Sequence, residues 1–92
     1  MIKTQVINIR FHEKGDNYCY IGRGSKWGNP FIIGKDGDRN EVVEKYEKYI
    51  RNKPELLKDL TELKGKRLGC FCFPHKCHGD ILLKLLKENN IE

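Results

Sequence analysis

The sequence predicts a small α/β domain with an open sheet of about three strands and helices packed on it, in the order β-β-α-α-β-α, similar to a fragment of a Rossmann-like fold. A stretch near the start is rich in β-branched residues and alternates in the manner of a strand, and a second short strand follows a polar turn. Two amphipathic helical stretches then separate them from a third strand, and a leucine-rich helical stretch follows. This succession of strands and helices is typical of α/β proteins.

Composition indicates one globular domain over residues 1–92, with 34% charged and 38% apolar residues. A core of this size is modest, so a partner, a metal or oligomerisation would add stability. No stretch is apolar enough to span a bilayer, and the polar start lacks the apolar core of a signal peptide. We therefore expect no membrane association and a cytoplasmic location. The net charge of +5 favours an anionic partner.

The first strand is predicted over residues 5–11 and the second over residues 18–21, with a polar turn between them. We expect the second strand to run antiparallel to the first. The following segment, residues 22–37, contains glycines and a proline throughout, which predicts a long loop. Loops of this length in small domains are usually functional.

A helix is predicted to begin at Asp38, because Asp38 and Glu41 have the spacing of a capping box. Its apolar stripe consists of Val42, Val43, Tyr46, Tyr49 and Ile50. Pro54 then opens a second short helix, which carries Leu56, Leu57, Leu60 and Leu63 and ends at Gly65.

Residues 67–73 form the third predicted strand, which should be parallel to the second because helices separate the two. A last helix follows the turn 74–80 and packs Ile81, Leu82, Leu85 and Leu86 on the sheet. In open α/β sheets ligands bind at the carboxyl ends of the strands. Both chemically unusual segments of the chain directly follow such ends.

The first unusual segment is the glycine-rich loop at residues 20–31. Its glycines make the backbone flexible, and its side chains include cations, a hydroxyl, an amide and an indole. Glycine amides can converge on phosphate oxygens, with Arg23 and Lys26 as counter-charges and Trp27 or Tyr20 stacking on a ring. The candidate ligand-binding residues are Gly22, Arg23, Gly24, Ser25, Lys26, Trp27, Gly28 and Asn29. The structural alternative is a loop that needs glycines to turn and uses Trp27 and Phe31 to cover the core.

The second unusual segment is the cysteine-histidine turn at residues 70–80, which supports three interpretations. A tetrahedral zinc site would use Cys70, Cys72, Cys77 and His78, or His75 as the imidazole. A catalytic site would use Cys77 as a nucleophile activated at the start of the helix, His78 or His75 as proton carrier and Asp80 as the orienting carboxylate. The third interpretation is structural, with small buried cysteines and an ordinary helix start.

These two segments, together with the capped helix between them, resemble the family of domains of unknown function numbered 4326. The likeness rests on Tyr-Ile-Gly-Arg-Gly-Ser-Lys-Trp-Gly-Asn-Pro-Phe at residues 20–31 and Leu-Gly-Cys-Phe-Cys-Phe-Pro-His-Lys-Cys-His-Gly-Asp at residues 68–80. Phe71 stands where the family commonly has tryptophan. The resemblance implies a small α/β protein of phage or bacterial type, with Gly22, Arg23, Gly24, Trp27, Gly28 and Asn29 as one signature and Cys70, Cys72, Pro74, Cys77 and His78 as the other. It implies no settled activity.

The preferred hypothesis is one pocket, formed where the two segments meet, for a phosphorylated small molecule such as a nucleotide or nucleotide-sugar. Whether the pocket also catalyses a reaction is left open. The first alternative is a zinc-stabilised module for nucleic acid, with Lys64, Lys66 and Arg67 joining Arg23 and Lys26 on the phosphates. The second is a homo-oligomeric interaction protein that uses the stripe of residues 42–50 as its interface.

Overall fold

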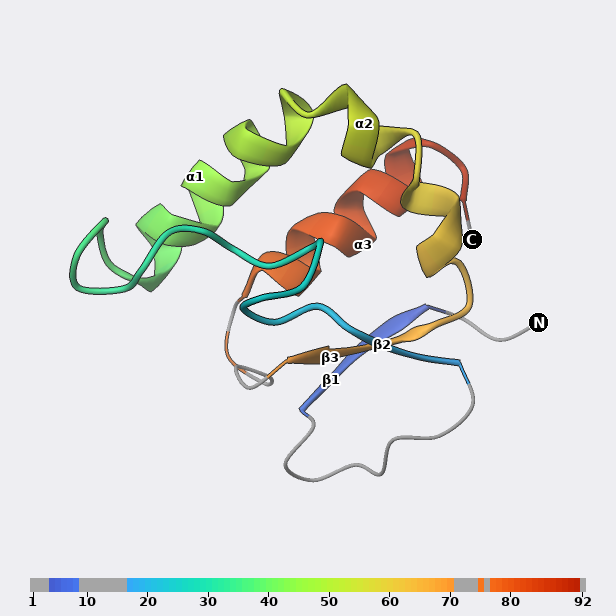
Figure 1. Cartoon of the computed structure of the whole chain (residues 1–92), viewed down its shortest axis with the longest axis horizontal. Coiled ribbons are helices and arrows are strands. Elements are labelled where there is room, and N and C mark those ends of the chain that lie inside the picture. Colours follow the sequence, from blue (N-terminus) through green and yellow to red (C-terminus); the bar gives the residue numbers. More distant parts are fainter. Residues whose placement is uncertain (1–3, 9–16, 71–74, 76, 92) are drawn as a thin grey trace.

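Three strands and a layer of helices make up the fold of the chain (Figure 1). The structure is a computed structural model and describes residues 4–8, 17–70, 75 and 77–91. Its elements are β1 (Gln5–Asn8), β2 (Tyr18–Tyr20), α1 (Arg39–Arg51), α2 (Pro54–Leu57), the 3-10 helix η1 (Leu60–Leu63), β3 (Arg67–Cys70) and α3 (His78–Glu88). The predicted order is confirmed, and the second helical stretch is divided into α2 and η1. Among the described residues, no helix combines the length and the apolar character needed to cross a bilayer.

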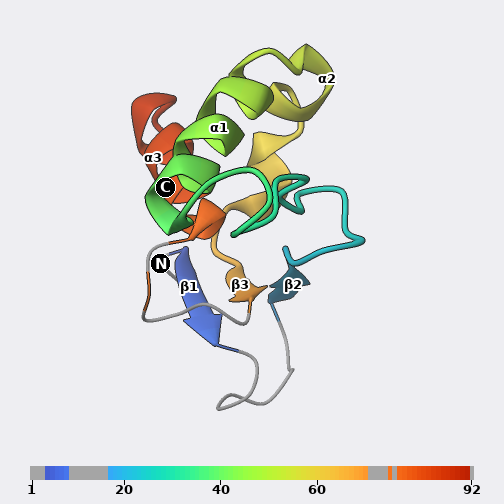
Figure 2. The ribbon, with the colours of Figure 1, turned by 90° about the vertical axis from the view of Figure 1, so that its left-hand side faces the viewer.

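The sheet has the order β1-β3-β2, and both outer strands run parallel to β3 (Figure 2). Leu68 of β3 pairs with Val6 on one side and with Cys19 on the other. The parallel pairing of the second and third strands is thus confirmed, whereas the antiparallel pairing of the first two is wrong. β3 carries the deeply buried Leu68 and Cys70 and takes the central place, where its backbone can bond on both sides. As a result, all three strands end at the same edge of the sheet.

The helices cover one face of this sheet and enclose the core between the two layers (Figures 1 and 2). The predicted capping box starts α1, since the Glu41 amide donates to the Asp38 carboxylate at 2.9 Å and the Asp38 amide donates to the Glu41 carboxylate at 3.0 Å. The apolar stripe of α1 faces inward, and its members Val42, Val43, Tyr46 and Ile50 are buried. These four members of the stripe are therefore part of the core.

Helix α3 begins directly above the sheet, at the same edge as the strand ends. Its N-cap residue is Cys77, whose amide donates to the Asp80 carboxylate at 3.1 Å. Gly79 lies so close to the sheet that a Cβ atom there would stand 2.9 Å from Val6 and 3.0 Å from Ile21. The close packing at Gly79 brings the first turn of α3 against the end of β2.

Candidate functional site

A pocket of about 470 Å³ lies at the edge where the strands end, and we call it the carboxyl-edge pocket. Residues of the glycine-rich loop form one part of its wall, and the ends of β3 and α3 form another. The first turns of α1 complete it. Its lining residues are Tyr20, Gly22, Arg23, Asn29, Phe31, Ile32, Ile33, Arg39, Val42, Val43, Cys70, Cys77 and His78. Two segments far apart in the sequence thus line a common cavity.

Arg23 is the cation that the glycine-rich loop presents at this pocket. Its side chain is exposed and makes no hydrogen bond or ion pair with any other described residue. The loop turns sharply beside it, because Gly24 has a φ of +90° and the Ser25 amide donates to the Gly22 carbonyl at 3.1 Å. A planar guanidinium in this position can make paired hydrogen bonds to carboxylate or phosphate oxygens.

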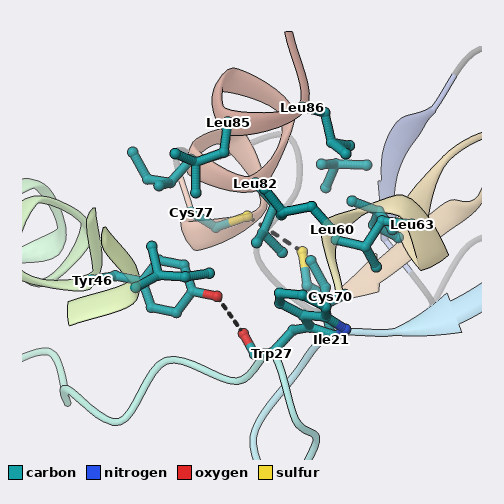
Figure 3. Close-up of a cluster of buried hydrophobic side chains, with 14 of the residues drawn as sticks. Ile21, Trp27, Tyr46, Leu60, Leu63, Cys70, Cys77, Leu82, Leu85 and Leu86 are labelled. Atoms are coloured by element: carbon teal, nitrogen blue, oxygen red, sulfur yellow. Dashed lines mark hydrogen bonds between the residues drawn. The ribbon is translucent and has the colours of Figure 1, made fainter. Parts of the chain in front are cut away.

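Trp27 belongs to the core, not to the ligand surface (Figure 3). Its side chain is 2% exposed, and its Nε1 donates to the Glu62 carboxylate at 3.1 Å. Its backbone carbonyl accepts a hydrogen bond from the buried Tyr46 hydroxyl at 2.7 Å. The expectation that Trp27 stacks on a ligand is corrected, and the structural alternative holds for this residue. An indole next to four polar or glycine residues looked exposed in the sequence, but the loop folds it inward.

Lys26 is engaged in ion pairs away from the carboxyl-edge pocket. Its ammonium group lies 2.7 Å from Asp59 and 3.0 Å from Glu62. Hydrogen bonds to Asp59 and Glu62 raise the pKa of Lys26, and this side chain does not line the pocket. The structure therefore separates Lys26 from Arg23, which the sequence placed together on a phosphate.

The other loop residues of the predicted site shape the backbone. The Ser25 hydroxyl donates to the Gly22 carbonyl at 2.6 Å. The Asn29 side chain donates to the Val42 carbonyl at 3.1 Å and accepts from the Phe31 amide at 2.9 Å, which joins the loop to α1. At Gly28 a Cβ atom would lie 2.7 Å from the Gly22 carbonyl oxygen. These residues hold the loop in the conformation that places Arg23 at the pocket.

Cys70 and Cys77 face each other (Figure 3). Both residues line the carboxyl-edge pocket. Their Sγ atoms are 3.5 Å apart, and both side chains are buried. The hydrogen bond with Cys70 and burial raise the pKa of the Cys77 thiol, although the Gly79 amide acts in the opposite direction. These surroundings favour the thiol form of Cys77 over the thiolate that the helix start suggested.

The predicted metal site is only partly within the described residues. Cys72 lies outside them, and in the described part of the chain no group of three or more potential ligands is close enough to hold a metal ion. His78 is 7% exposed, and its Nε2 lies 2.5 Å from the Ile21 carbonyl oxygen. Because a carbonyl only accepts, Nε2 carries the proton and is not available as a metal ligand. Cys70 and Cys77 remain as a pair of adjacent sulfurs.

Asp80 is directed away from the carboxyl-edge pocket, although His78 lines it. The Asp80 side chain is exposed, caps the Cys77 amide and borders a separate hollow with Thr4, Lys84 and Lys87. Burial lowers the pKa of His78, and the hydrogen bond to Ile21 and the charge of Asp80 raise it. The structure thus brings Cys77 and His78 to one cavity and leaves Asp80 outside it. His75 is exposed and does not line the pocket.

The comparisons with known proteins place the chain in a family. The family model described as "Domain of unknown function (DUF4326)" matches residues 7–88. The chain belongs to this family. The DUF4326 chain is 45% identical over 86 residues to an uncharacterised protein of Acanthamoeba polyphaga mimivirus, and this match covers 74% of the chain and 65% of the viral protein.

A second relative of the DUF4326 chain comes from Enterobacteria phage T4. It is described as an uncharacterised 12.4 kDa protein in the nrdA-td intergenic region, and it is 42% identical over 80 residues, covering 82% of the chain and 72% of the phage protein. The chain therefore spans about two thirds of the mimivirus relative and somewhat more of the phage relative. No solved structure matches the chain.

Several residues that line the pocket of the DUF4326 domain were not identified from the sequence. Arg39 lines the pocket from the first turn of α1. Ile32 and Ile33 are 37% and 49% exposed at its rim, which is unusual for adjacent large apolar side chains. The available signals were an arginine directly after a helix cap and two consecutive isoleucines inside a polar loop.

Among the described residues, the cations that the nucleic-acid alternative invokes do not gather at one end of the sheet. Arg67 opens β3 and pairs with Gln5 and Tyr18 at the opposite end of the strands from Arg23. Lys66 precedes it at that same end, and Lys26 is bound to acidic side chains. A nucleic-acid surface of the kind predicted would instead carry these cations along one continuous track.

Proposed function

We propose that the DUF4326 domain binds a phosphorylated small molecule, of the nucleotide or nucleotide-sugar class, in the carboxyl-edge pocket. One observation carries the proposal: a single cavity combines an arginine that has no partner among the described residues with a wall of exposed apolar side chains. A nucleotide matches these two parts of the cavity, because it has an anionic phosphate at one end and a flat apolar ring at the other. The cavity volume of about 470 Å³ lies within the range of small-molecule sites.

Arg23 supplies the phosphate contact in this proposal. A guanidinium fork suits phosphate oxygens, and charge-assisted hydrogen bonds of this kind are about twice as strong as neutral ones. The location also supports it, because ligands of open α/β sheets bind beyond the carboxyl ends of the strands. Arg39 lines the same cavity from the start of α1 and would lie close to the ligand.

The apolar ring of the ligand would lie against Phe31, Ile32 and Ile33. Phe31 is held edge-on against Tyr49, with ring centroids 6.2 Å apart, so this wall has a fixed aromatic member. Ile32 and Ile33 expose apolar surface that a bound ring would cover. These residues take the role that the sequence assigned to Trp27.

Binding without catalysis agrees best with the described side chains. The pKa of Cys77 is raised by its hydrogen bond with Cys70 and by burial, and the Nε2 of His78 is engaged with Ile21, so the pair lacks the lowered thiol pKa and the free Nε2 that favour acyl or phosphoryl transfer. Cys19 and Cys77 are free thiols, which agrees with a reducing compartment and supports the proposal of a cytoplasmic protein.

The test is isothermal titration of the purified chain with AMP, ADP, UDP-glucose, adenosine and inorganic phosphate. We expect AMP, ADP or UDP-glucose to bind at least tenfold more tightly than adenosine. Arg23→Ala should remove most of that difference, with a loss of about 10- to 100-fold in affinity, because a hydrogen bond to a charged group contributes about 1.5–3 kcal/mol.

Lys48→Ala is the matched control, because Lys48 is an exposed cation of α1 that does not line the pocket. Ile33→Ser is a second probe and should weaken nucleotides while leaving inorganic phosphate unaffected. If none of the phosphorylated ligands binds more tightly than about 1 mM, or if Arg23→Ala and Lys48→Ala behave alike, the proposal is wrong.

A further inference from the structure

The two sulfurs in the pocket wall form a pair that the proposed binding of a nucleotide does not use. Cys70 is the last residue of β3, and Cys77 is the N-cap of α3. Their Sγ atoms face each other 3.5 Å apart (Figure 3). Both residues line the carboxyl-edge pocket. A disulfide bond is about 2.05 Å long, so the sulfurs need to approach by roughly 1.5 Å. A change in the two side-chain torsions can supply such a movement.

We propose that Cys70 and Cys77 are a redox-active thiol pair, which a peroxide entering the carboxyl-edge pocket converts to a disulfide. The chemistry needs only the two sulfurs that the structure places together. A zinc site would need further ligands, and the described residues bring no third one to these sulfurs. Cys19 provides an internal comparison, because it is half-buried in β2 and does not line the pocket.

The reaction balances with hydrogen peroxide as the oxidant. One thiol, as its thiolate, attacks a peroxide oxygen, the O–O bond breaks, and a sulfenic acid and one water form after proton transfer. The second thiol attacks the sulfenic sulfur, the S–O bond breaks, and the hydroxyl leaves as a second water. The pair loses two electrons and two protons, and the peroxide is reduced to two waters.

The reactivity of the pair should depend on pH, because the thiolate and not the thiol attacks the peroxide. Oxidation should therefore accelerate as pH rises.

The disulfide would also change the pocket, and this consequence rests on the proposed function. Both sulfurs belong to the wall, and a bond between them would change the position of both side chains there. The adjacent His78 lines the same cavity. We therefore infer that the oxidised domain binds the nucleotide more weakly than the reduced domain, by at least fivefold.

Peptide mapping tests the disulfide without any ligand. Trypsin cleaves after Arg67, Lys76 and Lys84, so Cys70 and Cys72 occupy one peptide and Cys77 the next. The Cys72→Ser protein leaves Cys70 as the only thiol of the first peptide. After treatment with hydrogen peroxide and trapping of remaining thiols, we expect a peptide that joins residues 68–76 to residues 77–84, released by reduction.

The Cys19→Ser protein should give the same linked peptide as the wild type. The proposal is overturned if Cys72→Ser abolishes the link, or if Cys70 and Cys77 are recovered as separate sulfinic acids. It is also overturned if the purified wild type contains stoichiometric zinc that protects both thiols, because the pair would then be a metal site.

Titration of AMP, ADP and UDP-glucose into the oxidised and reduced Cys72→Ser proteins tests the coupling. A weaker affinity in the oxidised protein supports it, and equal affinities refute the coupling. If the link forms and no nucleotide binds either protein, the proposed function fails while the redox-active pair stands.

Discussion

The hydroxyl of Tyr46 donates a hydrogen bond to the backbone carbonyl of Trp27, 2.7 Å away, in the interior of the domain (Figure 3). Tyr46 is fully buried in α1, and Trp27 is 2% exposed in the glycine-rich loop. A second bond from Asn29 to the Val42 carbonyl joins the same two segments. The loop that presents Arg23 is therefore fixed to α1 at two points, which limits how far its position can vary.

Tyr46→Phe should lower the free energy of unfolding by about 1–3 kcal/mol, because the change leaves the buried Trp27 carbonyl without a partner while keeping the ring. Urea denaturation followed by tryptophan fluorescence measures this loss. Tyr49→Phe is the control, since Tyr49 is only half-buried, and its effect should stay within about 0.5 kcal/mol. Equal losses for the two variants would show that the hydrogen bond does not anchor the loop.

Gly28→Ala should also destabilise the loop, because the new Cβ would lie 2.7 Å from the Gly22 carbonyl oxygen. The obstacle is backbone, so relief requires the loop to shift, and we expect a loss of about 1–3 kcal/mol in the free energy of unfolding. A shift at Gly22 would also move Arg23, so nucleotide affinity should fall with stability. Asn40→Ala, at an exposed position of α1, is the control. An unchanged unfolding midpoint for Gly28→Ala would contradict the close approach.

Local sequence signals predicted the parts of the fold that depend on neighbouring residues. The capping box of Asp38 and Glu41 is such a case, because the two side chains and the amides that they cap lie within one turn. The strand order is the opposite case. Whether β2 pairs with β1 or β3 depends on contacts between distant segments, and no pattern inside residues 18–21 distinguishes the two.

The candidate site was predictable at the level of segments but not of side chains. Glycines and cysteines after strand ends indicated which segments converge at the pocket. The orientation of each side chain depends on tertiary partners, so Trp27 and Lys26 were assigned to a ligand although Tyr46 and Asp59 determine their positions. Arg39 was missed because a cation in the first turn of an amphipathic helix resembles any solvated residue.

His78 should make stability depend on pH below neutrality. Burial lowers the pKa of His78 in the folded chain, so the unfolded chain binds the proton first as pH falls below about 6.5. The free energy of unfolding should consequently decrease between this pH and the lower folded pKa, by at most about 1.4 kcal/mol per pH unit, and stay constant above it.

Urea denaturation at a series of pH values measures this dependence. His78→Gln should flatten the curve, whereas His75→Gln should leave it unchanged because His75 is exposed. A curve that keeps its slope in the His78→Gln protein would assign the effect to another group.

Glu47 connects α1 to α3 at the surface of the helical layer. Its carboxylate lies 3.1 Å from Lys84 of α3 and 2.8 Å from Arg51, which in turn pairs with Glu88 of α3 at 2.7 Å. Hydrogen bonds to Lys84 and Arg51 lower the pKa of Glu47. The stabilisation is therefore present above the pKa of an unfolded glutamate, about 4.3, and is lost as pH falls through the folded value.

Glu47→Gln should lower the free energy of unfolding by about 0.5–1 kcal/mol at pH 7 and low salt, because exposed ion pairs contribute little individually and this carboxylate joins two cations. The loss should shrink in 1 M NaCl, where screening weakens the pairs that Glu47 makes. Glu44→Gln, an exposed change on the same helix, is the control and should have a smaller effect at either salt concentration. If both variants lose the same stability, or if salt leaves the difference unchanged, the contact between α1 and α3 depends on the packing of their buried residues and not on this carboxylate.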